Sequence, residues 1–142
     1  MSSPNDYPAR GRVKQIDDNT VVFVPAGTNY ELHLKRSETQ FSGPIDKPVE
    51  AMIRVTARKI WTVPSGGNFI QPIFGSPRII QGRVRWLDER RLVVHAGTSF
   101  LVELPQSDQA VDLANGAIEA GSLVNVTALP GAVFEPRVVV KT

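Results

Sequence analysis

The chain has 142 residues, with 16 basic and 14 acidic side chains, a formal net charge of +2 and no cysteine. Hydrophobic residues make up 42% and charged residues 21%, which excludes a wholly disordered chain because there is enough apolar material for a core. The lack of cysteine excludes disulfides, Cys-based zinc sites and Cys nucleophiles, and fits a cytoplasmic location. No run reaches 18 apolar residues, so we expect no membrane span.

Three short strands are predicted after a flexible N-terminal segment, residues 1–8. Apolar and polar residues alternate along them, most clearly where Tyr30, Leu32 and Leu34 share one side, as in a half-buried strand. Turn-forming residues separate the strands, so we expect an antiparallel meander. The predicted strands cover residues 12–16, 20–24 and 29–35.

A long strand is predicted next, over residues 49–60, after a polar loop. Its apolar positions alternate with basic and threonine side chains, which indicates one buried and one exposed face. The apolar stretch that follows, residues 69–74, contains Pro72. Proline cannot donate to a strand ladder, so this stretch is confined to an edge, a strand start or a bulge.

The first meander then occurs a second time, because residues 82–104 repeat residues 11–34. The matched positions are Gly11 with Gly82, Val13 with Val84, Asp17 with Asp88, and Gly27–Thr28 with Gly97–Thr98. In the alignment of the two copies, the inward set Phe100, Val102 and Leu104 corresponds to Tyr30, Leu32 and Leu34. This internal repeat is the strongest signal in the chain, and it predicts two similar modules.

The second copy differs from the first in its connection. Residues 107–116 are predicted to form a short helix, because Ser107 is a good N-cap and Gly116 a good stop. Two strands follow, at residues 122–129 and 133–141, and the first of them matches the long strand of the first copy. Each copy therefore contains three meandering strands, a variable connection and two more strands.

This order of elements resembles the OB-fold, a small five-stranded Greek-key barrel. We therefore expect an all-β protein of two tandem OB-like barrels, with residues 9–80 in the first module and residues 81–142 in the second. The alternative architecture is one larger barrel in which the two repeats interlock. The resemblance is one of strand order and carries no diagnostic motif.

Candidate residues for catalysis or metal binding are few. The only histidines, His33 and His95, lack ligand spacing to each other or to a pair of carboxylates, and they occupy unmatched positions in the repeats. The sequence contains no nucleophile elbow, zincin motif or phosphate-binding loop. We therefore predict a binding module that is not an enzyme, with no catalytic residues, no metal and no cofactor.

Basic residues are the most informative feature left once folding is accounted for. Arg12 and Lys14 match Arg83 and Arg85 in the repeat, and Arg78 adds further charge near the second pair. Cations that follow phosphates, together with rings that stack on bases, are typical of single-stranded DNA or RNA binding. We therefore predict weak binding of single-stranded DNA or RNA that does not depend on the base sequence. The predicted nucleic-acid-binding residues are Arg12, Lys14, Arg54, Arg58, Lys59, Trp61, Arg83, Arg85, Arg90 and Arg91.

Two features of the sequence count against nucleic-acid binding. Long basic side chains also cover the exposed side of a strand without binding anything, and Glu31, His33 and Glu103 occupy the face that OB-folds usually use for nucleic acid. Exposed apolar residues, Leu101 and residues 69–74, instead favour a partner protein. The alternative function is thus a protein-interaction or assembly scaffold, and neither function involves a membrane.

Overall fold

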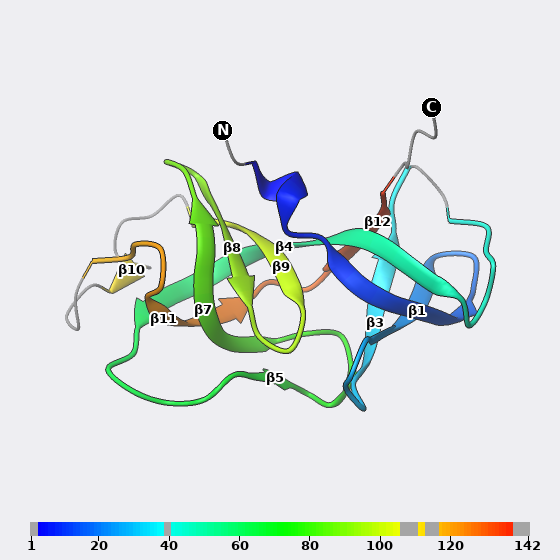
Figure 1. Ribbon diagram of the computed structural model, residues 1–142, viewed down its shortest axis with the longest axis horizontal. Helices are drawn as coiled ribbons and strands as arrows, with labels where there is room; N and C mark the ends of the chain where they lie inside the picture. The colour runs from blue at the N-terminus through cyan, green and yellow to red at the C-terminus, as the bar shows by residue number, and fades with distance from the viewer. Residues whose placement is uncertain (1–2, 39–40, 106–110, 113–116, 138–142) are drawn as a thin grey trace.

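The structure is a computed structural model that describes residues 3–38, 41–105, 111–112 and 117–137 (Figure 1). These residues are all β, apart from a single 3₁₀ turn, η1, at Pro4–Asp6. The strands are β1 (Ala9–Ile16), β2 (Thr20–Pro25), β3 (Glu31–Arg36), β4 (Pro48–Thr62), β5 (Phe69–Gln71), β6 (Phe74–Gly75), β7 (Ile79–Leu87), β8 (Arg91–His95), β9 (Ser99–Glu103), β10 (Val111–Asp112), β11 (Leu123–Ala128) and β12 (Val133–Pro136).

The strands close into two rings of five. The first ring runs β1–β2–β3–β12–β4 and returns to β1, with β12 parallel to β3. The second ring runs β4–β11–β7–β8–β9 and returns to β4, with β9 parallel to β4. The prediction of an all-β chain that closes five-stranded barrels is confirmed.

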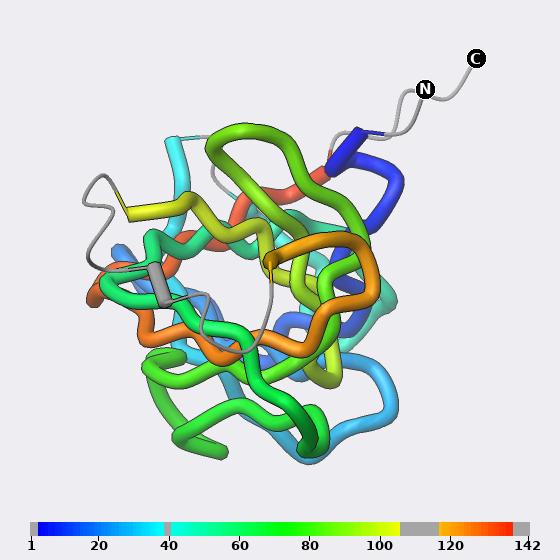
Figure 2. The backbone as a smooth tube through the Cα atoms, turned by 90° about the vertical axis from the view of Figure 1, so that its left-hand side faces the viewer, coloured from blue at the N-terminus to red at the C-terminus, as the bar shows by residue number. Residues whose placement is uncertain are grey.

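Strand β4 belongs to both rings. Its residues 48–54 pair with β1 and β12, whereas its residues 54–62 pair with β9 and β11. Figure 1 shows β4 crossing the length of the molecule, with β7, β8 and β9 at one end and β1 and β3 at the other. Figure 2 is viewed from the end that carries the second ring. A single continuous strand therefore couples the two barrels.

Strand pairing crosses the predicted module boundary at residue 80. Strand β12 comes from the C-terminal half of the chain and closes the first ring, while β4 comes from the N-terminal half and closes the second. Each ring thus needs strands from both halves. The division into modules 9–80 and 81–142 stays a prediction, but hydrogen bonding does not separate the chain there.

The predicted helix at residues 107–116 is wrong where the structure describes it. Val111 and Asp112 form β10, which pairs in parallel with Ile60 and Trp61 of β4. The physical reason is that β9 stops pairing with β4 at Thr56. The backbone groups of β4 after Thr56 therefore need another hydrogen-bonding partner on that side. The other residues of that range lie outside the described part of the chain.

The two meanders share their irregularities. The β1–β2 pairing shifts register at Lys14, between Val13 and Gln15, and the β7–β8 pairing shifts between Val84 and Trp86. Such bulges bend a strand and increase its twist, as closure of a small barrel requires. Both meanders therefore bend at the same point of the repeat.

Apolar side chains fill both rings. In the first, Phe134 of β12 packs against Phe23 and Phe41, with ring centroids 5.5 and 5.6 Å away. In the second, Phe100 and Ile80 are completely buried. Alternation along the strands places these side chains inside and the charged ones outside, as predicted from the pattern.

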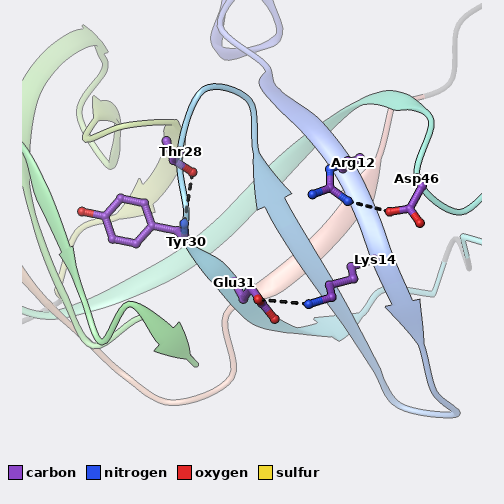
Figure 3. A network of polar contacts seen from close by, with 6 residues as sticks. All are labelled: Arg12, Lys14, Thr28, Tyr30, Glu31 and Asp46. Carbon is purple, nitrogen blue, oxygen red and sulfur yellow. Dashed lines mark hydrogen bonds and ion pairs between the residues drawn. The ribbon is translucent and has the colours of Figure 1, made fainter.

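Residues 69–75 form a bridging segment that connects the two rings. Its strand β5 pairs with β7 of the second ring, and its strand β6 pairs with β3 of the first. Tyr30, before β3, accepts a hydrogen bond at its hydroxyl from the backbone N–H of Ile70, at 3.1 Å. Figure 3 shows the Tyr30 ring pointing from the first ring toward the strands of the second.

Candidate functional site

The predicted basic residues of the first ring are neutralised by nearby acids. Arg12 of β1 forms an ion pair with Asp46 at 2.6 Å, and Lys14 forms one with Glu31 of β3 at 3.1 Å (Figure 3). Exposed pairs of this kind contribute little to stability, but they cancel the local charge. These two residues therefore offer a weak attraction for phosphates.

Two predicted residues at the middle of the molecule are also paired. Arg54 of β4 contacts Glu135 at 2.7 Å. Arg91 of β8 contacts Asp88 at 3.2 Å and lies over the ring of Trp86, 5.5 Å from its centre. Backbone N–H groups in the turn after Asp88 donate to its carboxylate and, together with Arg91, lower the pKa of Asp88. The acid thus has a structural role in the β7–β8 turn.

The basic pair of β7 is split between two environments. Arg83 donates to the carbonyl oxygen of Gly121 at 3.1 Å. Arg85 is exposed at the register shift, near His95. Burial, and secondly the charge of Arg85, lower the pKa of His95. His95 is therefore a half-buried side chain that loses its proton more readily than a free histidine.

Three of the remaining predicted residues, Arg58, Lys59 and Trp61, lie on the outer face of the second-ring half of β4. Arg58 occupies the register shift between β4 and β11, where Ala57 and Lys59 pair with consecutive residues of β11. Arg58 and Lys59 are exposed, and Trp61 is half-buried. Arg90 is exposed in the β7–β8 turn, away from this strand. Within the described ranges, none of these three basic side chains forms an ion pair.

A groove of about 960 Å³ lies beside Arg58, and a second arginine, Arg78, lines it as well. Arg78 has no described carboxylate partner either; its backbone is held by bonds to Gln71 and Ala128. The walls between the two arginines include Gln71, Pro72, Ile79, Thr127 and Leu129. The groove therefore combines two uncompensated positive charges with an apolar surface.

Arg78 is the groove residue that is not among the binding residues predicted from the sequence. Arg78 lies five residues before Arg83 in the chain, which suggests that the two act together. Arg78 instead precedes β7 at the end that faces β11 and the bridging segment, and it joins Arg58, which is distant in sequence. Only the pairing of β4 with β11, and of β11 with β7, brings these two arginines to one groove.

A second groove, of about 760 Å³, lies on the first ring. Its arginines are compensated: Arg10 contacts Glu50 at 2.8 Å, and Arg137 contacts the same carboxylate at 3.3 Å. These contacts, with the hydrogen bond from Arg10 as the largest cause, lower the pKa of Glu50. Arg12 also lines this groove and is held by Asp46, so the groove is less attractive to an anion than the groove at Arg58.

Other chemistry is sparse. No cluster of three or more His, Cys, Asp or Glu suited to a metal ion occurs in the described residues. No described helix is long and apolar enough to cross a membrane. Comparison with protein-family models, with curated proteins and with solved structures found no match. The function is therefore inferred from the geometry of the chain.

Proposed function

We propose that this protein is a non-enzymatic binding module for single-stranded DNA or RNA, with the groove between Arg58 and Arg78 as its binding site. The observation that carries this proposal is that two exposed arginines without a described acidic partner line the same groove. Guanidinium groups bind phosphates well. Lys59 and Trp61, farther along β4, provide a further cation and a ring for stacking.

We infer that both rings are OB-like barrels that arose by duplication. Each has a meander of three strands, a fourth strand, and a further strand parallel to the third. Gly11 and Gly82, matched in the repeat, both lie so close to the neighbouring strand that a Cβ atom would overlap a carbonyl oxygen. The shared bulges, and the close contact of both glycines with the neighbouring strand, support a common origin of the two rings. The cytoplasmic location stays a prediction.

The proposed site differs from the usual OB site. OB-folds commonly bind on the face of their second and third strands, which here are β8 and β9 in the second ring. That face carries Glu103, and its Arg91 is already paired with Asp88. The groove at Arg58 lies instead between β4, β11 and the start of β7, where the arginines are uncompensated.

A salt titration tests the proposal. Fluorescence anisotropy of a labelled oligonucleotide at several salt concentrations gives the slope of log K against log salt. If Arg58 and Arg78 each contact one phosphate, Arg58→Ala and Arg78→Ala should each reduce the magnitude of that slope by about 0.7, the value expected per phosphate of a single strand. Arg12→Ala is the matched control, because Arg12 is an exposed strand arginine held by Asp46.

Two results would contradict the proposal. The first is no binding by the native chain at low salt, where electrostatic attraction is strongest. The second is a loss in Arg12→Ala as large as that in Arg58→Ala, which would mean that binding depends on overall charge and not on the groove.

The alternative function, a scaffold for a partner protein, is supported by the bridging segment. Ile73 and Phe74 are 55% and 62% exposed, next to Pro72 in the wall of the groove. Such neighbouring exposed apolar side chains are typical of protein contacts. A Phe74→Ser variant should then lose a partner captured by crosslinking while its oligonucleotide binding is unchanged. An oligonucleotide affinity that falls with Phe74→Ser would argue against a separate protein site.

A further inference from the structure

Four strands on one side of the second ring carry a row of aromatic and amide side chains. Strands β5, β7, β11 and β4 are hydrogen-bonded neighbours. Residues that pair directly across a sheet point to the same face. The paired positions are Phe69 with Gln81, Gln81 with Asn125, and Asn125 with Trp61. All four are half-buried on the outer face, because their sequence neighbours Ile60, Ile70, Ile80 and Val126 are in the core.

This row lies directly beside the groove. The next row of paired residues includes Gln71, Ile79 and Thr127, all of which line the groove between the two arginines. Side chains on one face of a strand are two residues apart, so the rows are separated by about 7 Å. A strand of nucleic acid whose phosphates lie in the groove would thus carry its bases within reach of Trp61 and Asn125.

The two amides of the row differ in their hydrogen bonding. Gln81 donates to the carbonyl oxygen of Gly67 at 2.8 Å, which holds the loop of residues 64–68 against the sheet. The side-chain oxygen of Asn125 is buried, and none of the described residues donates a hydrogen bond to it. A buried acceptor without a donor is unfavourable. A ligand that supplies a donor to Asn125 would remove that penalty.

The covering loop is suited to move. Residues 64–68 are exposed and include two adjacent glycines, Gly66 and Gly67. Gly66 has a φ of +149°, which residues with a side chain rarely adopt, and a Cβ atom there would push the Gln81 amide aside. The contact therefore depends on glycine. The N–H of Val63 donates to the carbonyl oxygen of Leu123 at 2.8 Å and fixes the start of the loop. Beyond it, the hydrogen bond from Gln81 holds the loop against the sheet, and its loss would free the Gln81 amide.

We propose that Trp61, Asn125 and Gln81 form a base-contacting site, which rests on the nucleic-acid binding proposed above. An unpaired base stacks on the Trp61 ring, and the amides hydrogen-bond to the edge of the base when residues 64–68 move aside. Stacking on aromatic rings together with hydrogen bonds to base edges is how proteins read unpaired bases. Arg58 and Arg78 hold the phosphates, and the row discriminates modestly among bases.

The test compares two probes of the same length, a normal single-stranded oligonucleotide and one made of abasic nucleotides, which keep the phosphates and lack the bases. The native chain should bind the normal probe at least about fivefold more tightly, since each stacked base contributes measurably. Asn125→Ala should reduce the difference between homopolymers of different bases and leave the salt slope unchanged. Arg58→Ala should reduce the slope and leave the preference for bases unchanged.

Two controls make the outcomes distinct. Gln15→Ala removes an exposed amide on the first ring that donates to the Asp17 carboxylate, and it should change neither quantity. The melting temperature of each variant shows that it is folded, and Asn125→Leu serves where Asn125→Ala does not fold. Equal affinity for both probes would overturn the base-contacting site and leave the phosphate groove standing. Failure of both probes to bind at low salt would overturn both proposals.

Discussion

Gly11→Ala should destabilise the whole molecule, although it alters a single strand of the first ring. A Cβ atom at Gly11 would overlap the carbonyl oxygen of Val24 and lie 2.8 Å from the ring of Phe23 and 2.9 Å from Cα of Pro25. Two of these three atoms belong to the backbone, so relief requires β1 to move away from β2. We expect a cost of about 3 kcal/mol, the upper end for an overpacked site, which lowers Tm by about 10 °C in a chain of this length.

Tryptophan fluorescence reports whether that cost reaches the other ring. Both tryptophans of the chain belong to the second ring: Trp61 lies on its half of β4, and Trp86 lies on β7. Since β4 is continuous through both rings, we expect them to unfold together. The fluorescence midpoint of Gly11→Ala should then fall as far as the midpoint from far-UV circular dichroism, which follows all strands.

Gly67→Ala is the matched control. No atom lies within 4 Å of the place where its Cβ would stand, so we expect a change in unfolding free energy within about 0.5 kcal/mol. An equal effect of Gly11→Ala and Gly67→Ala would refute the steric reasoning. A shift in circular dichroism without a shift in fluorescence would refute the coupling of the two rings.

Two smaller predictions follow from side-chain contacts. Tyr30→Phe removes the acceptor for the N–H of Ile70 and should cost about 1 kcal/mol in urea unfolding; no change would mean that this contact does not hold the rings together. Because burial lowers the pKa of His95 below its usual 6.5, the unfolded chain binds the proton more readily, and stability should fall as pH drops from about 6.5 toward the folded pKa. In His95→Gln the difference in urea midpoint between mildly acidic and neutral pH should shrink; an unchanged difference would assign it to another group.

The local pattern of the sequence predicts strands and their buried faces well. Leu32 and Leu34, and likewise Phe100 and Val102, are buried as their alternation indicates. The alignment of the copies is less accurate along β9. Leu32 pairs with Phe23, and Phe100 pairs with Val94, which takes the place of Phe23 in the second meander. Phe100 therefore corresponds to Leu32 and not to Tyr30, because the turn before β9 is shorter. A shift of two residues keeps the same face inward.

The pairing of distant strands is what the pattern could not supply. Alternation in residues 49–60 shows that a strand forms but not that it serves two rings, since any strand of either copy could lie beside it. Strand β4 has 15 residues, well above the usual five or six. A strand of this length can extend beyond one small barrel, so its length is the local feature that indicates a shared strand. Closure of the first ring by β12 depends on contacts far apart in sequence.

The candidate site shows the same limit. Arg12 and Lys14 stand out in the sequence because they recur in the repeat, yet Asp46 from a loop and Glu31 from another strand neutralise them. Acids that lie across a sheet do not appear in the pattern of a single strand. Recurrence of a basic residue therefore does not show that its charge is available to a ligand.

Arg58 of the groove lies where the two copies differ. The match between residues 53–57 and 124–128 aligns Leu129 with Arg58 in the repeat. In the structure both residues line the same groove. The groove thus joins a position of each copy, and it depends on β4 lying beside β11. An arrangement that uses corresponding residues in different roles cannot occur twice in the chain. Binding there should accordingly saturate at one short oligonucleotide per chain, whereas two equivalent sites would point back to the features that the repeats share.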